Sequence, residues 1–192
     1  MATQPEPAQL QDLEARAREF ARGAGSILLD HFQKPLEVEF KGKGQRHPVT
    51  AADRAAQDYL RQAIQTAYPD HAFLAEESGS DELAQSDFTW VADPLDGTSN
   101  FINGLPIFCV SLGVLYRGQP IIGCISTPAA SRVMGEMFHG HRGGGAFLNG
   151  QRLAVLPELA PSKLAALPSH YTAYMKPSRQ LAKKLGEARS LG

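Results

Sequence analysis

The sequence predicts an α+β fold in which N-terminal helices pack on a largely antiparallel sheet. Two observations support this prediction. Apolar residues recur at helical spacing through most of residues 10–69, whereas beyond Phe101 short apolar runs alternate with tight-turn residues. Helices followed by a run of strands, rather than strands and helices in alternation, are typical of the α+β class.

Two amphipathic helices are expected in the N-terminal part. Between Leu10 and Phe32 apolar residues mostly recur at steps of three and four, which predicts a helix that ends before Pro35. A second helix is expected to start after Thr50 and to stop at Pro69. Its apolar stripe consists of Ala52, Ala56, Tyr59, Ala63 and Ile64.

The expected strands are short apolar runs bounded by turn residues, prolines or acidic residues. They are Leu36–Phe40, residues 72–78, residues 89–94, residues 108–128 and residues 133–156. A Gly/Lys loop is expected after the first run. A hairpin is expected to turn at Arg117–Pro120, and a second tight turn is expected at Asn149 and Gly150. A further helix is expected at Ser178–Ala188.

The composition is that of a globular protein, with 43% hydrophobic and 20% charged residues in a chain of 192. A net charge of −1 provides no overall field for nucleic acid or a membrane surface. The charge is uneven, because residues 1–96 carry 17 acidic and 9 basic side chains and residues 97–192 carry 3 and 10. Two interpretations remain open: two solvated halves folded against each other, or a cation site with basic groups nearby for an anionic substrate.

Three features favour a soluble, cytoplasmic protein. The N-terminal residues lack the basic start and apolar core of a signal peptide. No segment approaches the roughly 18 apolar residues of a membrane-spanning helix. Cys109 and Cys124 lie in apolar stretches without a C-x-x-C pair, which indicates buried thiols in a reducing compartment rather than a disulfide or a zinc site.

Asp93 and Asp96 are the foremost candidates for chemistry. They follow the apolar run Trp-Val-Ala, and the proline between them cannot continue a strand ladder. We therefore expect the strand to break there and to turn both carboxylates and the Leu95 carbonyl toward one point. Such oxygen ligands suit Mg²⁺, and the Gly-Thr-Ser that follows suits a phosphate at a helix start. The alternative is an ordinary turn followed by a side-chain cap.

Other polar residues have structural interpretations beside functional ones. Thr50 and Asp53 have the spacing of a capping box, so Asp53 fits a helix cap as well as a catalytic group. Glu76 and Glu77 fit a metal site or a solvated loop.

Three weaker patterns are interpreted as structural. His139 and His141 lack a third ligand at a useful spacing, so we expect them to be surface strand residues. The Gly-rich run at residues 140–145 lacks the Gly-Lys-Ser/Thr of a P-loop and predicts a hairpin turn. Ser99 and Ser111 have no His at an informative spacing, so a serine hydrolase is not indicated.

Four segments together resemble the inositol monophosphatase family. They are HPVTAAD at residues 47–53, AEES at 75–78, WVADPLDGTSNF at 90–101 and RGGGAFLNGQRLAV at 142–155. Their order and separations are similar to the family's from near residue 10 to residue 192. The resemblance implies a layered αβαβα sugar-phosphatase fold. It places an N-terminal metal-binding domain at residues 1–155 and the start of an incomplete C-terminal α/β domain at residues 156–192.

The resemblance implies a set of metal ligands. Glu76, Asp93 and the Leu95 carbonyl are expected to hold a first Mg²⁺, and Asp93 and Asp96 to contribute to a second. A complete enzyme of the family is expected to use two or three Mg²⁺ ions.

The resemblance also implies catalytic and substrate-binding roles. Glu76 and Thr98 are expected to orient and help deprotonate the attacking water, while Asp53 accepts a hydrogen bond from the Thr98 hydroxyl. Glu76, Asp96 and the backbone N–H groups of Gly97 and Thr98 are expected to contact the substrate phosphate or its alcohol.

The implied activity is Mg²⁺-dependent, lithium-sensitive hydrolysis of inositol monophosphate or a related small sugar or alcohol phosphate. The enzyme is expected to be cytoplasmic and, in its complete form, a homodimer. Relatives within the superfamily act on histidinol phosphate, fructose 1,6-bisphosphate or 3′-phosphoadenosine nucleotides, and the segment G-T-S-N-F favours inositol phosphate.

One expected ligand of the family has no counterpart here. The family's second metal takes an Asp from a Trp-Asp element, but Trp90 is the one Trp and no Asp follows Asp96. The alternative is therefore a catalytically impaired fragment, or a binding protein of the same fold, and the 192 residues alone are expected to turn over little substrate. Either Lys41 or Lys43 corresponds to a lysine of the family's loop.

Overall fold

The computed structural model describes residues 5–35, 38–41, 47–75, 86–130, 135–154, 165–167 and 188–190. They belong to two compact units, Met1–Leu153 and Ala154–Gly192. The helices of the first unit are α1 (Pro7–His31), α2 (Ala51–Ala67) and α3 (Thr98–Ile102). Its strands are β1 (Val38–Lys41), β2 (His47–Thr50), β3 (Ala72–Ala75), β4 (Phe88–Asp96), β5 (Cys109–Tyr116), β6 (Gln119–Thr127), β7 (Glu136–His141), β8 (Gly145–Leu148) and β9 (Gln151–Arg152). The second unit contains β10 (Ala165–Leu167) and β11 (Ala188–Ser190), which pair in parallel.

Both expected N-terminal helices form, and each begins at a start signal in the sequence. α1 has Pro7 in its first turn, where the missing N–H is not needed. α2 begins after Thr50, whose hydroxyl accepts the backbone N–H of Ala52 at 3.2 Å. The carboxylate of Asp53 accepts the backbone N–H of Thr50 at 2.8 Å in return, which completes the expected capping box.

Strands β3 to β9 form one sheet in sequence order, with seven strands in the described part of the chain. β3 and β4 are parallel, and the other neighbouring pairs are antiparallel. Arg117 and Gly118 connect β5 to β6 with φ of 49° and 76°, and Asn149 and Gly150 connect β8 to β9 with 49° and 82°. Positive φ at both positions is what a two-residue hairpin turn requires. The predicted α+β class, with helices on a largely antiparallel sheet, is confirmed.

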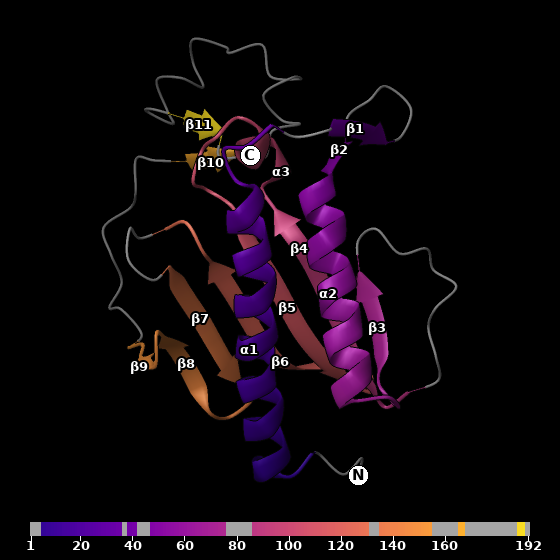
Figure 1. The fold of residues 1–192 in the computed structure, drawn as a ribbon. Helices are drawn as coiled ribbons and strands as arrows, with labels where there is room; N and C mark the ends of the chain where they lie inside the picture. Colours follow the sequence, from indigo (N-terminus) through magenta and orange to yellow (C-terminus); the bar gives the residue numbers. More distant parts are fainter. Residues whose placement is uncertain are drawn as a thin grey trace. The chain divides into compact units, whose positions relative to one another are not determined.

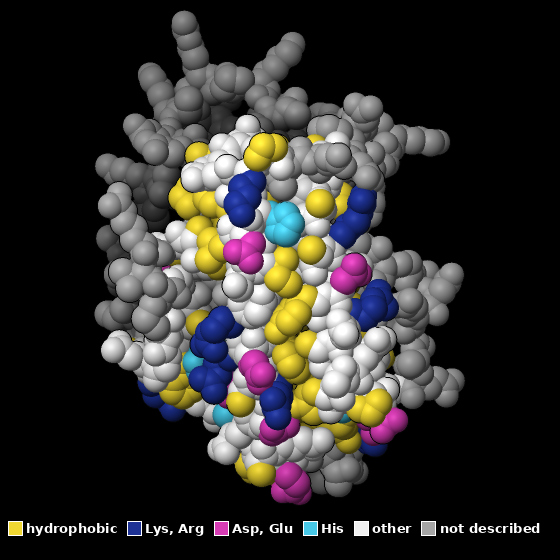
Figure 2. Space-filling model, in the orientation of Figure 1, with side chains coloured by type: hydrophobic (Ala, Val, Ile, Leu, Met, Phe, Trp, Pro, Cys, Tyr) yellow, Lys and Arg dark blue, Asp and Glu magenta, His cyan; other side chains and the backbone are white. Residues whose placement is uncertain are grey.

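Helices α1 and α2 cover one face of this sheet, as Figure 1 shows. The core between the two layers is built from alternate strand residues and from one stripe of each helix. It includes Leu13, Phe20, Leu28, Leu60, Ile64, Trp90, Val110, Leu112, Val114 and Cys124. Each large apolar side chain buried in this way contributes about 1.5–3 kcal/mol. The outer side of the two helices carries interspersed basic and acidic side chains, which identifies it as a solvated surface (Figure 2).

Strand β2 differs from expectation, because residues 47–50 were expected to form a loop. They pair instead with β1 in antiparallel register, with Val38 opposite Thr50. The strand was not predicted because Pro48 lies in it. Proline is tolerated at the edge of a sheet, but in a sequence it argues against a strand. The consequence for the site is that β2 leads directly into the cap of α2.

Several expectations fall outside the described residues. The helix expected at Ser178–Ala188 does so except for Ala188, which begins β11. The loop after Lys41, with Lys43, and the expected domain boundary between residues 155 and 156 do so as well. Within the described segments, no helix is long and apolar enough to span a bilayer.

Candidate active site

The end of β4 contains a β-bulge that reorients its acidic residues. Asp93 pairs with Ser111 and Asp96 pairs with Cys109, so three steps along β4 are matched by two along β5. Residues three apart on a regular strand point to opposite faces, but the extra residue brings Asp93 and Asp96 to the same one. That face is turned away from α1 and α2, because Val110 lies between the two partners on the helix side.

This bulge corrects the expectation that the strand ends at the proline. β4 continues through Pro94 to Asp96, and the ladder with β5 resumes after the register shift. Proline cannot donate to a ladder, but a bulge leaves a residue unpaired at which this donor is not required. The expected convergence of the two carboxylates therefore arises from a bulge within the strand, not from its termination.

Local hydrogen bonds orient the groups of the bulge. The carboxylate of Asp93 accepts the backbone N–H of Leu95 at 3.1 Å, which holds it beside the chain that follows. The Leu95 side chain is buried, and its carbonyl accepts the hydroxyl of Thr98 at 3.0 Å. Asp96 is exposed to solvent. Two carboxylates and a carbonyl thus lie within four consecutive residues. The carboxylate of Asp93 is held by the Leu95 N–H, and that of Asp96 is open to solvent.

Gly97 makes the turn from β4 into α3. Its φ is 91°, in the left-handed region that glycine adopts readily. A Cβ atom there would lie 2.8 Å from the carbonyl oxygen of Ile107. The first N–H groups of a helix have no partner within the helix. The turn at Gly97 therefore presents the start of α3, including Thr98, immediately after Asp96.

Asp53 connects the cap of α2 to this turn. One carboxylate oxygen accepts the backbone N–H of Thr50, and the other accepts the Thr98 hydroxyl at 3.3 Å. Asp53 is buried, with 6% of its surface exposed. The two interpretations of Asp53, helix cap and site residue, are compatible in one side chain. The Thr98 hydroxyl has one proton, so its contacts with Asp53 and with the Leu95 carbonyl share that proton.

Cys109 is a neighbour of the acidic pair that the sequence did not single out as a site residue. Its thiol lies 3.7 Å from the Asp96 carboxylate. Burial, together with the charges of Asp96 and Asp93, raises the pKa of the Cys109 thiol to about 12. It is half-buried, whereas the other expected buried thiol, Cys124, is fully buried, and both are free. The Cys109 thiol is therefore protonated beside the two carboxylates.

The oxygen donors of the bulge suit a hard cation. Asp93, Asp96 and the Leu95 carbonyl offer oxygen ligands only, the set that Mg²⁺ prefers. Glu76 and Glu77, which follow β3 directly in the sequence, lie outside the described residues. Within the part of the chain that the structure describes, no three His, Cys, Asp or Glu side chains are grouped to hold a metal. The described donors thus fit part of a Mg²⁺ site and require further ligands.

A hollow of about 940 Å³ lies over the sheet face that carries Asp93. Its lining is mostly apolar and includes Leu74, Val91, Ile125, Phe138 and Phe147. An apolar surface offers neither hydrogen bonds nor charge to a phosphate. The bulge and the turn beside it offer backbone N–H groups for a phosphate and carboxylates for a cation that would accompany it. The candidate site is therefore placed at the bulge and the start of α3.

His139 and His141 were expected to be surface strand residues, which is wrong. His139 is buried, with 8% of its surface exposed, and both imidazoles face α1. Each contacts the carboxylate of Glu14, which is also buried. The signal in the sequence was an acidic residue between Leu13 and Ala17 on the apolar stripe of α1, because a charge there must have a buried partner.

The comparisons with known proteins agree with this fold. The model of the inositol monophosphatase family matches residues 9–188. "Nus factor SuhB" of Escherichia coli K12 is 41% identical over 133 residues, covering 69% of this chain and 48% of that protein. "Inositol monophosphatase 3" of Solanum lycopersicum is 38% identical over 143 residues, covering 72% and 51%. The solved IMPase of Thermotoga maritima has a TM-score of 0.77 at 30% identity, covering 94% of this chain and 68% of that one.

The fold, the family model and the relatives together define the family of this chain. The chain belongs to the inositol monophosphatase family. It spans about half the length of the curated relatives that it matches.

Proposed function

We propose that this chain provides the metal- and phosphate-binding part of a Mg²⁺-dependent phosphomonoesterase. The substrate class is inositol monophosphate or a related small sugar or alcohol phosphate. The observation that carries the proposal is the bulge in β4, which brings Asp93 and Asp96 to one face directly before Gly97. A protein of the same fold, with a TM-score of 0.77, was solved with Mg²⁺ and phosphate, which agrees with the proposal.

The proposed Mg²⁺ ligands are Glu76, Asp93, the Leu95 carbonyl and Asp96. Bound Mg²⁺ supplies a lowered pKa of a coordinated water and stabilisation of negative charge on the phosphoryl oxygens. Asp93 is suited to an inner position, because the Leu95 N–H already orients its carboxylate. Asp96 is suited to the solvent side, where a substrate arrives, because it is exposed.

Thr98 and Asp53 have the arrangement of a positioned proton relay. Asp53 is fixed by the backbone N–H of Thr50, so its second oxygen is held toward the Thr98 hydroxyl. A hydroxyl that donates to Asp53 keeps its lone pairs for a proton of the attacking water, and Glu76 is proposed as that water's other partner. The backbone N–H groups of Gly97 and Thr98 donate to the phosphate oxygens.

A second candidate is a binding protein of the same fold without turnover. One observation favours it: several relatives carry the name Nus factor. Both candidates require the metal site at the bulge, and only the first requires catalysis.

The two candidates are separated by phosphate release in Mg²⁺ from the whole protein of which this chain is proposed to be a part, because the 192 residues alone are expected to turn over little substrate. The substrates are inositol 1-phosphate, histidinol phosphate, fructose 1,6-bisphosphate and 3′-phosphoadenosine 5′-phosphate. The enzyme proposal predicts Mg²⁺-dependent release, fastest with inositol 1-phosphate, that Asp93→Asn abolishes and Asp58→Asn, an exposed site on α2, leaves unchanged. Release that persists in Asp93→Asn contradicts the assignment, and metal binding without release from any substrate supports the binding protein.

A further inference from the structure

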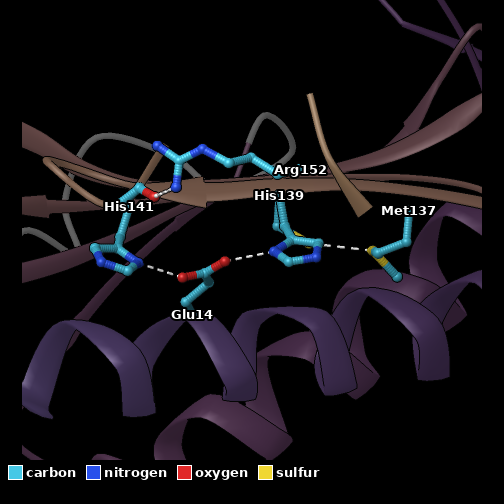
Figure 3. A network of polar contacts seen from close by, with 7 residues as sticks. Glu14, Met137, His139, His141 and Arg152 are labelled. Carbon is cyan, nitrogen blue, oxygen red and sulfur yellow. Dashed lines mark hydrogen bonds and ion pairs between the residues drawn. The ribbon is translucent and has the colours of Figure 1, made fainter. Parts of the chain in front are cut away.

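A buried polar bridge joins α1 to β7, away from the bulge in β4. Glu14 projects from the core-facing stripe of α1 and has 7% of its surface exposed. One of its oxygens contacts Nδ1 of His139 and the other contacts Nδ1 of His141 (Figure 3). The carboxylate lies between the two rings, and 125 residues of sequence separate Glu14 from His139.

The spacing of the two histidines suits a bridging carboxylate. They are two residues apart on β7, so they point to the same face with their Cα atoms about 6.6 Å apart. A carboxylate between them gives each ring its own oxygen. A metal ion instead requires its donors to converge within about 2 Å of one point, and no such trio occurs among the described residues. The arrangement is therefore a hydrogen-bonded bridge.

The surroundings of the bridge are mostly neutral and apolar. On β6, Cys124 is paired with His139, and burial raises the pKa of its thiol to about 12, so it carries no charge. Arg18 and Arg22 lie on the next two turns of α1 after Glu14, and their positive charges act to lower the pKa of the Cys124 thiol. β5 and α2 present apolar residues to this interface, namely Val110, Leu112 and Val114, and Ala56, Leu60 and Ile64. The imidazoles of His141 and His139 therefore act directly on the Glu14 charge.

The chemistry of the bridge depends on the charge of Glu14. An ionised carboxylate only accepts hydrogen bonds, so each histidine must donate an Nδ1–H. A protonated carboxyl group has a donor of its own, and this donor would face one of the two Nδ1–H groups. One of the two bonds is then lost, and polar groups are left unsatisfied under the helix.

We propose that Glu14 is an acid-sensitive latch: ionised, it holds α1 on β7 through both histidines, and its protonation loosens α1 from the sheet. The direction of the pKa shift agrees with this geometry. Burial raises the pKa of Glu14, but the hydrogen bonds and charges of His141 and His139 outweigh it and bring the pKa below its ordinary 4.5. A depressed carboxyl pKa stabilises the fold above 4.5, and this stability is lost as the pH falls through the folded-state value.

Hydrogen exchange of α1 amides tests the latch. Protection factors are compared for the protein and Glu14→Gln from pH 7 to pH 3, with Glu19→Gln, on the exposed side of α1, as the matched control. Glu14→Gln is expected to lower the protection of α1 about 10-fold at pH 7, because charged hydrogen bonds are lost. The difference is expected to narrow below pH 4.5 and to vanish only below the folded-state pKa of Glu14. Glu19→Gln is expected to follow the unaltered protein throughout.

Equal protection of α1 in Glu14→Gln and the unaltered protein at pH 7, or a ratio that does not change with pH, overturns the latch. A second measurement needs no variant, in case Glu14→Gln does not fold. ¹⁵N NMR of the histidine rings at pH 7 is expected to show a proton on Nδ1 of both His139 and His141. An unprotonated Nδ1 on either ring equally overturns the proposal.

Discussion

The hydroxyl of Thr98 lies 3.3 Å from the carboxylate of Asp53, although 45 residues separate them in sequence. This contact links the capped start of α2 to the turn that follows the bulge in β4. Because Asp53 is fixed by the backbone of Thr50, the helix cap sets the position of a candidate catalytic group. Under the proposed function, this one buried side chain would support both the stability of α2 and catalysis.

Replacement of Asp53 by Asn is expected to affect both properties. The amide keeps one acceptor oxygen, so it cannot accept hydrogen bonds from Thr50 and from Thr98 at the two places where the carboxylate of Asp53 does. We expect a loss of about 1–2 kcal/mol in the free energy of unfolding, and a fall in any Mg²⁺-dependent phosphate release, measured by urea unfolding and by a phosphate assay. Asp58→Asn, at an exposed site on the same helix, is the control and is expected to change neither. Equal free energies of unfolding for Asp53→Asn and Asp58→Asn would show that the hydrogen bonds of Asp53 do not stabilise the fold.

Replacement of Gly97 by Ala tests the tight turn. An alanine at φ 91° costs about 1–2 kcal/mol, and its Cβ would meet the Ile107 carbonyl at 2.8 Å. That carbonyl is held by the side-chain amide of Asn100 at 2.8 Å, so it is not free to move aside.

Gly104 offers a matched control, because its φ is 71° and a Cβ there meets nothing within 4 Å. In urea unfolding, Gly104→Ala is expected to show the backbone cost alone, and Gly97→Ala a larger loss. Similar losses in the two variants would contradict the close approach.

The contact between Trp90 and His71 predicts a second pH dependence of the free energy of unfolding. The indole N–H of Trp90 donates to Nδ1 of His71 at 3.1 Å, and the imidazole is stacked between Tyr68 and Phe88. Burial lowers the pKa of His71 from 6.5 despite the charge of Asp70. A depressed histidine pKa means that the unfolded state binds the proton first, so stability is present above pH 6.5 and is lost as the pH falls toward the folded-state value.

The measurement is the urea midpoint between pH 8 and pH 5, followed by the fluorescence of Trp90, the one Trp of the chain. In His71→Asn the amide oxygen still accepts the indole N–H but does not titrate, so the loss of stability below pH 6.5 is expected to be smaller. Parallel pH curves for the two proteins would rule out His71 as the titrating group.

Much of the fold could be predicted, because its signals are local. The apolar stripe and capping box defined α2 within its observed bounds, and the Asn149-Gly150 pair defined a turn. Pro94 correctly marked an irregularity, but the sequence could not distinguish a strand end from a bulge. That outcome depends on whether the β5 ladder resumes beyond Pro94, which is a tertiary property.

The parts that could not be predicted involve long-range pairing. His139 and His141 have the spacing of ordinary strand residues in the sequence. Their burial depends on the contact with Glu14 of α1, which is 125 residues away from His139. The sequence predicted Cys109 as a buried thiol and not as a neighbour of Asp96. Its position beside Asp96 follows from the register of β4 and β5. β2 was missed because Pro48 weakened a strand pattern that pairing with β1 completes.

The central claim is that Asp93 and Asp96 hold a divalent cation next to a phosphate bound at Gly97 and Thr98. Mn²⁺ is a paramagnetic substitute for Mg²⁺, so EPR can titrate its binding and ³¹P relaxation can detect inorganic phosphate nearby. We expect the 192-residue chain to bind Mn²⁺ and to enhance the relaxation of phosphate, and Asp93→Asn to lose both while Asp58→Asn keeps both. Unchanged Mn²⁺ binding in Asp93→Asn, or bound Mn²⁺ without any effect on phosphate, would contradict the account.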